Sequence, residues 1–285
     1  MFLNKIQKKM SKNFLINGIE THELDARIIL KEVLSFNDKD LILNQDFLIS
    51  KNLINKINSF ELRRIKGEPI SKIFKKRDFY NSTFIISEDV LDPRPETELI
   101  IDIANDLIKN NHVKNILDLG TGSGCILLSI LKEHKTIIGT GIDLSKKAID
   151  IAIKNSRKLS LEKQSNFFIS NWLDSINDTY DLIVSNPPYI PSTDIENLPM
   201  DVKNFDPILS LDGGSDGLDC YRKIAKDLKR VINKNGVIIL EIGYDQAYKV
   251  IKIFELLDFI LVRKYNDING LDRVLVFEIK KIKKN

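Results

Sequence analysis

The sequence predicts an α/β protein whose sheet is doubly wound and mainly parallel, with a smaller helical region at the amino end. From about residue 91 onward, short apolar runs alternate with segments of helical periodicity, which is the pattern of strands and crossover helices. A glycine-rich turn at residues 120–124 follows one apolar run, and Asn186-Pro187-Pro188-Tyr189 follows another. Because ligands bind at the carboxyl ends of strands in such sheets, both segments are candidate site elements.

The composition is that of a globular protein with a real apolar core. The chain has 285 residues, 43% of them hydrophobic, which is enough for one large and one small domain. A net charge of +3 argues against a dedicated nucleic-acid binder. Cys125 and Cys220 make no disulfide framework, and with three histidines they form no metal-ligand spacing. With no signal-like or membrane-spanning apolar stretch, we expect a cytoplasmic protein, and we expect it to act as a monomer without a metal or a membrane.

Residues 1–70 are predicted to form a helical domain that docks the substrate. Thr21 and Ser50 can each cap a helix, because apolar residues at helical spacing follow both. Gly67 ends the second helix and Pro69 prevents its continuation. The region carries no catalytic constellation, so a partner-docking bundle and a merely stabilising appendage are both open interpretations.

Residues 71–90 are predicted to form a hairpin linker, because aromatic and β-branched residues flank Asn81-Ser82. The catalytic domain is predicted at residues 91–285. It opens with a helix to about residue 110, since Pro95 suits a first helical turn and acidic residues follow it. The helix start does not explain Arg94, which stands between two prolines and is a candidate cleft residue.

Seven strands and four further helices follow, and a lysine-rich segment at residues 280–284 reads as a solvated tail. The predicted strands are residues 115–119, 137–142, 167–169, 182–185, 237–242, 259–265 and 274–279. The predicted helices are residues 125–132, 145–159, 220–232 and 246–257.

The glycine-rich turn Gly120-Thr121-Gly122-Ser123-Gly124 joins a strand to a helix, so glycines there allow a tight turn and close approach of a ligand to the backbone. The spacing is G-x-G-x-G, which is not the dinucleotide pattern, and no P-loop lysine is present. Asp143 follows about twenty residues later, where a carboxylate can accept both ribose hydroxyls. The alternative is a turn residue before a cap at Ser145. A nucleoside without pyrophosphate, S-adenosylmethionine, fits this arrangement.

Asn171 and Trp172 follow the third predicted strand. A polar or aromatic residue at this place could contact the adenine ring of the nucleoside. An amphipathic tryptophan at the edge of the sheet is nearly as well supported.

The two prolines of Asn186-Pro187-Pro188-Tyr189 hold the backbone stiffly, because proline fixes its own φ and restricts the residue before it. The Asn186 side chain and the carbonyls of Asn186 and Pro187 can therefore accept two hydrogen bonds from a planar NH₂ group. Tyr189 can lie flat beside that group. A rigid turn with Asn186 as an Asx cap is the alternative.

These segments together resemble the class I methyltransferases that act on amino or amide nitrogen. More narrowly, the chain resembles the bacterial protein-(glutamine-N5) methyltransferases of peptide chain release factors, over nearly its whole length. The segments that carry this resemblance are PRPETE at residues 93–98, DLGTGSG at 118–124, GID at 141–143, SNPPYIP at 185–191, DGGSDGLD at 212–219, EIG at 241–243 and LDRV at 271–274. The chain departs from the pattern of this family at three positions. Asn171 stands where the family often has Asp, Asp206 replaces the usual Glu, and Asp92 replaces an apolar residue.

The resemblance implies a Rossmann-like fold, S-adenosylmethionine as methyl donor with S-adenosylhomocysteine as product, and a target glutamine in a Gly-Gly-Gln loop of release factors. It implies that the glycine turn, Asp143, Asn171, Trp172 and Asn186 bind the cofactor. Asn186, Pro187 and Tyr189 would be catalytic, and with Pro188 they would bind the substrate amide.

Two other functions compete with this one. A nucleic-acid adenine or guanine methyltransferase shares the NPPY segment, but it should bring a basic target-recognition domain and a stronger positive charge. A non-catalytic methyltransferase-like binding protein should have lost the glycines, Asp143 or Asn186, and all are present.

Overall fold

The computed structural model describes residues 1–110 and 112–280, so most of the predicted tail lies outside the described residues. The chain divides into two compact units. The first comprises Met1–Lys75 with Met200–Phe205, and the second comprises Lys76–Pro199 with Asp206–Asn285.

The first unit is helical, as expected for the amino-terminal region. Apolar residues that include Phe14, Ile29 and Ile57 form its buried core. Ser50 caps its helix by accepting a hydrogen bond from the Leu53 N–H, whereas the Thr21 hydroxyl donates to Asp25 instead of capping. The helices are α1 (Leu3–Ile16), α2 (His22–Leu34), α3 (Asp38–Leu43), α4 (Lys51–Ile65), α5 (Ile70–Phe74) and α9 (Met200–Phe205).

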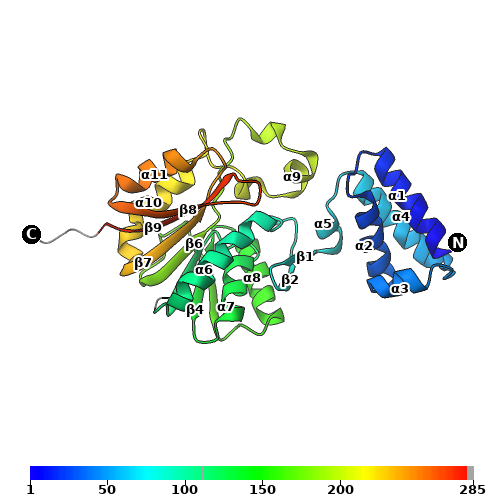
Figure 1. Ribbon diagram of the computed structural model, residues 1–285, viewed down its shortest axis with the longest axis horizontal. Coiled ribbons are helices and arrows are strands. Elements are labelled where there is room, and N and C mark those ends of the chain that lie inside the picture. The colour runs from blue at the N-terminus through cyan, green and yellow to red at the C-terminus, as the bar shows by residue number, and fades with distance from the viewer. Residues whose placement is uncertain (111, 281–285) are drawn as a thin grey trace, which may run out of the picture. The chain divides into compact units, whose positions relative to one another are not determined.

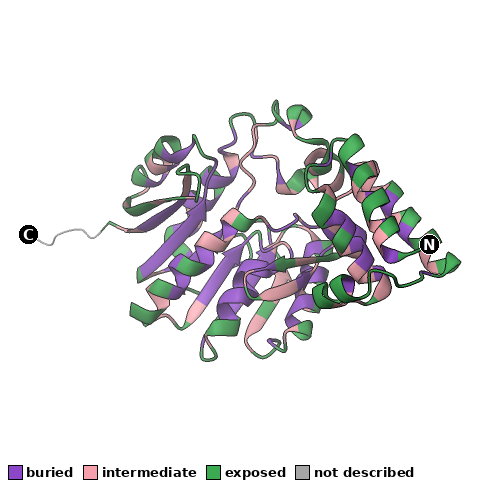
Figure 2. Ribbon diagram, turned by 45° about the vertical axis from the view of Figure 1, so that its right-hand side comes forward, coloured by how far each residue is buried: buried purple, intermediate pink, exposed green. Residues whose placement is uncertain are grey.

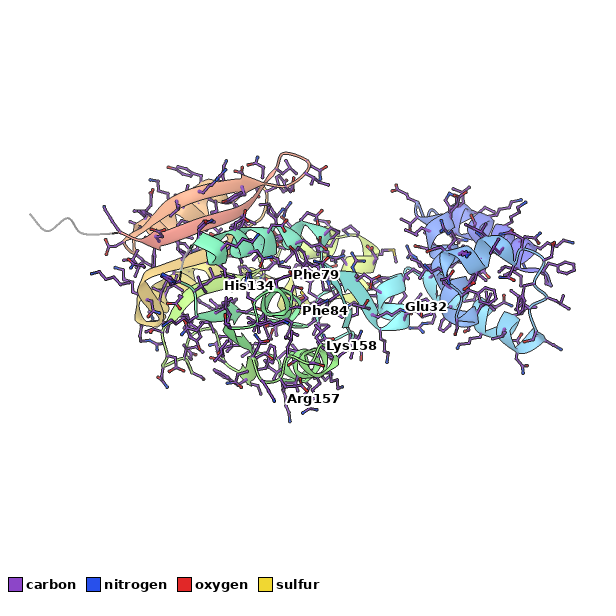
Figure 3. The ribbon with its side chains drawn as sticks, turned by 60° about the horizontal axis from the view of Figure 1, so that its bottom comes forward. Glu32, Phe79, Phe84, His134, Arg157 and Lys158 are labelled. Atoms are coloured by element: carbon purple, nitrogen blue, oxygen red, sulfur yellow. The ribbon has the colours of Figure 1, made fainter. Side chains whose placement is uncertain are left out.

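The predicted hairpin is present as β1 (Lys76–Phe79) and β2 (Ser82–Ile85), paired antiparallel. Its turn is Tyr80-Asn81, one residue earlier than the predicted Asn81-Ser82, and Tyr80 takes a left-handed φ of 51°. Phe79 and Phe84 are buried and pack edge to face, with ring centroids 6.2 Å apart (Figure 3). The hairpin therefore contributes to the core of the second unit.

The second unit is built on a seven-stranded sheet of order β5-β4-β3-β6-β7-β9-β8, which confirms the predicted α/β class (Figure 1). All neighbours from β5 to β7 pair in parallel, and β9 is antiparallel to both β7 and β8. The strands are β3 (Asn115–Leu119), β4 (Ile138–Asp143), β5 (Ser165–Ile169), β6 (Tyr180–Ser185), β7 (Ile232–Glu241), β8 (Phe259–Asn266) and β9 (Asp272–Ile279).

Helices cover both faces of the sheet and enclose two apolar cores. One core joins α6 (Glu98–Asn110), α7 (Cys125–Glu133) and the hairpin to the sheet, and the other joins α10 (Asp219–Val231) and α11 (Ala247–Glu255) to it. The central strands β3 and β6 are buried at all but one residue each, and Figure 2 draws the middle of the sheet mainly in purple. The remaining helix, α8 (Lys146–Lys158), packs beside α7 and β5, and Ser145 caps it as predicted.

Asn155 of α8 fastens the hairpin and the glycine turn to this helix. Its side chain accepts a hydrogen bond from the Ile85 N–H at 2.6 Å and donates to the carbonyls of Ile85 and Ser123 at 2.8 and 2.9 Å. The residue is completely buried. Buried backbone groups that lose such partners cost free energy, because no water replaces them.

We therefore expect Asn155→Ala to lower the free energy of unfolding by about 3 kcal/mol, since it leaves three backbone groups without partners. Urea denaturation followed by circular dichroism measures the change. Lys154→Ala, an exposed position on the same helix, serves as the control and should shift stability by less than about 0.5 kcal/mol. Equal stability of the two variants would contradict the anchoring role of Asn155.

Candidate active site

A cleft opens at the carboxyl ends of the central strands, where the winding of the sheet reverses between β3 and β6. This is the place at which doubly wound sheets bind ligands. The cleft has a volume of about 240 Å³ and is lined by residues from the loops that follow β3, β4, β5 and β6. The predicted site residues that line it are Gly120, Gly122, Asp143, Asn171, Trp172, Asn186 and Pro188.

The glycine turn has the backbone that the sequence predicts. Gly120, Gly122 and Gly124 have φ values of 70°, 54° and 79°. Residues other than glycine rarely adopt this left-handed region of φ. A Cβ at Gly124 would lie 3.1 Å from Leu128 Cδ1, whereas one at Gly122 would meet no atom within 4 Å. The turn therefore packs on its helix at one end and leaves its backbone open toward the cleft at the other.

Thr121 and Ser123 lie beneath the turn and do not line the cleft. Both are buried. The Thr121 hydroxyl donates to Asp118 Oδ2 at 2.6 Å, and the Ser123 carbonyl accepts from Asn155. In this structure the two residues support the turn from below.

Asp143 holds the glycine turn in place and faces the cleft. Its Oδ2 accepts from the Gly122 N–H at 2.9 Å, and its Oδ1 accepts from the Ser145 N–H at 2.8 Å. Burial raises the pKa of Asp143, and these backbone hydrogen bonds oppose the shift. Each carboxylate oxygen has a further lone pair, so the residue is able both to shape the turn and to accept from a ligand hydroxyl.

Asn171 and Trp172 form a turn that closes one side of the cleft. Trp172 adopts a left-handed φ of 47°, and its ring lies over Gly120, 3.9 Å from where a Cβ would stand. Ser170 fixes the turn by donating to the Trp172 carbonyl at 2.7 Å. Asn171 is exposed and donates to Asp174. A non-glycine residue in this conformation is strained, which is consistent with a turn held for function.

The Asn186–Tyr189 segment presents different faces to the cleft and to the core. Asn186 and Pro188 line the cleft, whereas Pro187 is buried. The Asn186 Nδ2 donates to Thr97 Oγ1 at 3.1 Å. The other polar atom of this side chain, Oδ1, is a hydrogen-bond acceptor. The Tyr189 ring packs against the core, and its hydroxyl lies 3.5 Å from Glu241 Oε1.

The loop that contains DGGSDG clamps the backbone just after this segment. The Ile190 N–H donates to the Leu211 carbonyl at 3.0 Å, and the Gly213 N–H donates to the Ile190 carbonyl at 2.8 Å. The buried Gln246 side chain donates to the Tyr189 carbonyl at 2.8 Å and to the Gly217 carbonyl at 3.2 Å. The Tyr189 carbonyl and the residue that follows it are thus held by hydrogen bonds.

Arg94 is held by an ion pair and does not line the cleft. Its Nη2 lies 2.6 Å from Asp206 Oδ2, and Asp206 Oδ1 accepts from the Asp92 N–H at 3.1 Å. Two of the three departures from the family pattern, Asp92 and Asp206, therefore lie together. This contact accounts for the arginine that the helix start did not explain.

Sequence reasoning missed three polar residues beneath the site: Thr97, Asp118 and Glu241. All are buried, and burial raises the pKa of both Asp118 and Glu241 to about 7. The DLGTGSG and EIG segments contain the two acids but do not reveal their burial. The cleft also includes residues that carried no sequence signal, among them Leu91, Leu209, Cys220 and Lys223.

The described residues, 1–110 and 112–280, offer neither a cluster of metal-binding side chains nor a helix able to span a membrane. They contain no group of three or more His, Cys, Asp or Glu side chains placed to hold a metal ion. None of their helices combines the length and apolarity that crossing a membrane requires.

Known proteins match this chain in both of its parts. Residues 78–198 match the family described as "Methyltransferase small domain", and residues 6–74 match the "PrmC N-terminal domain". A methyltransferase from Pyrococcus furiosus has a similar fold, with a TM-score of 0.51 at 15% identity over 79% of this chain and 100% of that one. The methyltransferase family match indicates an enzyme that uses S-adenosylmethionine, and the Pyrococcus furiosus structure confirms the fold.

Relatives of similar length are closer in sequence. The "Release factor glutamine methyltransferase" of Agrobacterium fabrum is 36% identical over 264 residues, which are 91% of each chain. The protein of the same name from Rhodospirillum rubrum is 35% identical over 97% of this chain and 85% of its own. The chain therefore belongs to the release factor glutamine methyltransferase family, as the resemblance of its motifs predicts.

Proposed function

We propose that this protein transfers a methyl group from S-adenosylmethionine to the side-chain amide nitrogen of the glutamine in the Gly-Gly-Gln loop of peptide chain release factors. The observation that carries the proposal is the orientation of Asn186 at the cleft. Because its Nδ2 donates to Thr97 at 3.1 Å, its Oδ1 is the atom left to accept from a substrate amide.

The reaction needs two hydrogen-bond acceptors for the N–H groups of the glutamine amide, because an amide nitrogen is a poor nucleophile. Its lone pair is delocalised into the carbonyl, and the amide must reach a form in which the nitrogen carries more charge. Asn186 Oδ1 and the Pro187 carbonyl accept the two N–H groups of the glutamine. These hydrogen bonds strengthen as the nitrogen becomes positive, so they stabilise the transition state more than the ground state.

Tyr189 and the rigid backbone contribute orientation. We assign Tyr189 the role of offering a π face to the developing cation. In this structure its ring packs against the core and does not line the cleft, while Gln246 holds its carbonyl and the DGGSDG loop holds the next residue. Holding the nitrogen in line with the methyl group supplies much of the remaining rate through proximity. The proton lost by the methylated amide leaves to water.

The residues around the cleft fit S-adenosylmethionine. The open backbone at Gly122 admits close approach of the nucleoside, and Asp143 has lone pairs for the ribose hydroxyls. Asn171 and Trp172 line the side of the cleft where they would contact the adenine ring. When bound, this cofactor supplies an electrophilic methyl group. Asn186, at the edge of the cleft, would contact both the cofactor and the target.

We further propose that the enzyme works as a monomer, in the cytoplasm, without a metal and without a nucleic-acid target. Support comes from the free cysteines Cys125 and Cys220, which suit a reducing compartment, and from the nearly balanced charge of the chain. The sulfonium group of the cofactor is itself a sufficient electrophile.

Residues 1–70 are proposed as the docking domain, residues 71–90 as a linker and residues 91–285 as the catalytic domain. The helical unit has its own apolar core, and every predicted chemical group lies outside it. A separately packed unit with no chemistry is suited to binding a folded protein substrate.

The direct test is mass spectrometry of release factor after incubation with this protein and S-adenosylmethionine. We expect a gain of one methyl group on the glutamine of the Gly-Gly-Gln loop. Methyl transfer to purified nucleic acid, with unmodified release factor, would favour the nucleic-acid alternative. Binding of the cofactor without transfer to either would favour the non-catalytic alternative.

Asn186→Ala should lower kcat roughly 100-fold, because it removes an acceptor that acts mainly in the transition state. The affinity for S-adenosylmethionine should change much less. Methyl-transfer kinetics and calorimetric titration measure the two quantities. Asn166→Ala, an exposed asparagine on β5, is the control and should retain wild-type kcat; an equal loss of turnover and cofactor affinity in Asn186→Ala would contradict its assigned role.

Removal of residues 1–75 should raise KM for intact release factor at least tenfold, because a docking unit contributes binding energy remote from the reacting atoms. Methylation of a short Gly-Gly-Gln peptide and cofactor binding should change little, and they also report that the catalytic unit is folded. Normal kinetics on intact release factor would show that the helical unit is only a stabilising appendage.

A further inference from the structure

Glu241 is a buried carboxyl group that the mechanism above does not use. It is the last residue of β7 and only 1% exposed. Its Oε2 has no hydrogen-bond partner, and its Oε1 lies 3.5 Å from the Tyr189 hydroxyl. A carboxyl group this poorly compensated is costly to bury, so its position calls for an explanation.

The register of the sheet brings Glu241 to the level of Asn186. Ser185 of β6 pairs with Leu240 of β7 in parallel, so Asn186, the first residue after β6, and Glu241, the last residue of β7, lie at the same level of the sheet. Thr97 is buried, and its hydroxyl oxygen accepts from the Asn186 Nδ2 at 3.1 Å.

Thr97 also interacts with Glu241. Its hydroxyl stabilises the charged carboxylate and so lowers the pKa of Glu241, against the larger effect of burial. Glu241 Oε2 has no hydrogen-bond partner in this conformation. Thr97 thus interacts with the Asn186 amide, by a hydrogen bond, and with the Glu241 carboxyl group, through its effect on the pKa of that acid.

The chemistry of these three groups decides which of them donates and which accepts in the series of hydrogen bonds from Glu241 through Thr97 to Asn186. An ionised carboxylate can only accept hydrogen bonds, whereas a hydroxyl donates one and accepts others. If Thr97 donates to Glu241, its lone pairs are left for Asn186, and they can pair only with the NH₂ group. The oxygen of Asn186 then faces the cleft.

We propose that Glu241 is a positioning residue that, through Thr97, orients the Asn186 amide so that Oδ1 rather than Nδ2 faces the target nitrogen. This rests on the proposed function in that the target is an amide whose N–H groups require an acceptor. Glu241 is too deeply buried to touch the substrate. In the reversed orientation, the Asn186 NH₂ group would face the NH₂ group of the target amide, and two donors cannot form a hydrogen bond with each other.

The surroundings of Glu241 set the pH at which this control operates. Burial raises its pKa to about 7, Thr97, Arg273 and Tyr189 oppose the shift, and Glu96 adds to it. On the remaining side, the Tyr221 hydroxyl donates to the Glu241 main-chain carbonyl at 3.0 Å. A protonated Glu241 can donate to the Thr97 oxygen, so that the Thr97 hydroxyl donates to Asn186 Oδ1 and the Asn186 NH₂ group turns toward the cleft. We therefore expect kcat to fall as the pH drops through about 7.

The kinetic test compares Glu241→Gln and Thr97→Val with the wild type across pH 6–8. We expect kcat to fall roughly 10- to 100-fold at pH 8 in both variants, with KM for release factor nearly unchanged and the loss of activity at low pH abolished. Thr97→Ser should restore most of the activity, since it keeps the hydroxyl. Glu255→Gln, an exposed acid at the end of α11, is the matched control and should behave as the wild type.

A spectroscopic test does not depend on the substrate. The ¹⁵N-labelled side-chain NH₂ signal of Asn186 should titrate near pH 7 in the wild type and in Glu255→Gln, but not in Glu241→Gln. Absence of that titration in the wild type, or wild-type kcat with an unchanged pH profile in Glu241→Gln, overturns the proposal. A wild-type protein that leaves release factor unmodified refutes the proposed function instead, and the NH₂ titration still decides the role of Glu241.

Discussion

The parallel register of β6 between β3 and β7 is the constraint on which the candidate site depends. Ser185 pairs with Leu119 on one side and Leu240 on the other, and its buried hydroxyl donates to the Leu119 carbonyl at 2.7 Å. The glycine turn after β3, Asn186 after β6 and Glu241 at the end of β7 therefore lie at one level of three neighbouring strands. A slip of one residue would exchange the faces of Leu182 and Val184, which pack in one core, and of Ile183, which packs in the other, so the packing that fixes the cores also fixes the site.

Two buried acids beneath the site are held at a cost in stability. Burial raises the pKa of Asp118 and of Glu241 to about 7, from ordinary values of 3.8 and 4.5. Because the folded-state pKa lies above the unfolded one, their contribution to stability is greatest below the ordinary pKa and is lost as the pH rises through about 7. Each fully ionised acid then costs on the order of 3 kcal/mol. An apolar residue would stabilise the fold better, which favours a functional reason for both.

The sequence predicts the strands of the sheet well, but it does not reveal the buried residues that hold the candidate site in place. Runs such as 182–185 and 237–242 are apolar on both sides, so they predict buried strands, and in the structure these strands begin two and five residues earlier and end within one residue of the predicted position. The hairpin turn was placed one residue late because an aromatic residue rarely takes the left-handed φ of Tyr80. α9 and the 3₁₀ turns are too short to show a period. Glu241 was missed because a charged residue at a strand end normally faces water.

The PRPETE segment shows why a motif can be specific without touching a ligand. Arg94 pairs with Asp206, Thr97 accepts from Asn186, and Glu98 accepts from the Tyr80 N–H at 2.7 Å. Three positions within five residues thus fasten three loops that come from distant parts of the sequence. Because each link needs its own chemistry (a cation, a hydroxyl and a carboxylate), the segment tolerates little exchange among polar residues. The order of these side chains is therefore set by the loops they hold, and the orientation of the amide at the cleft depends on a residue that precedes the whole sheet.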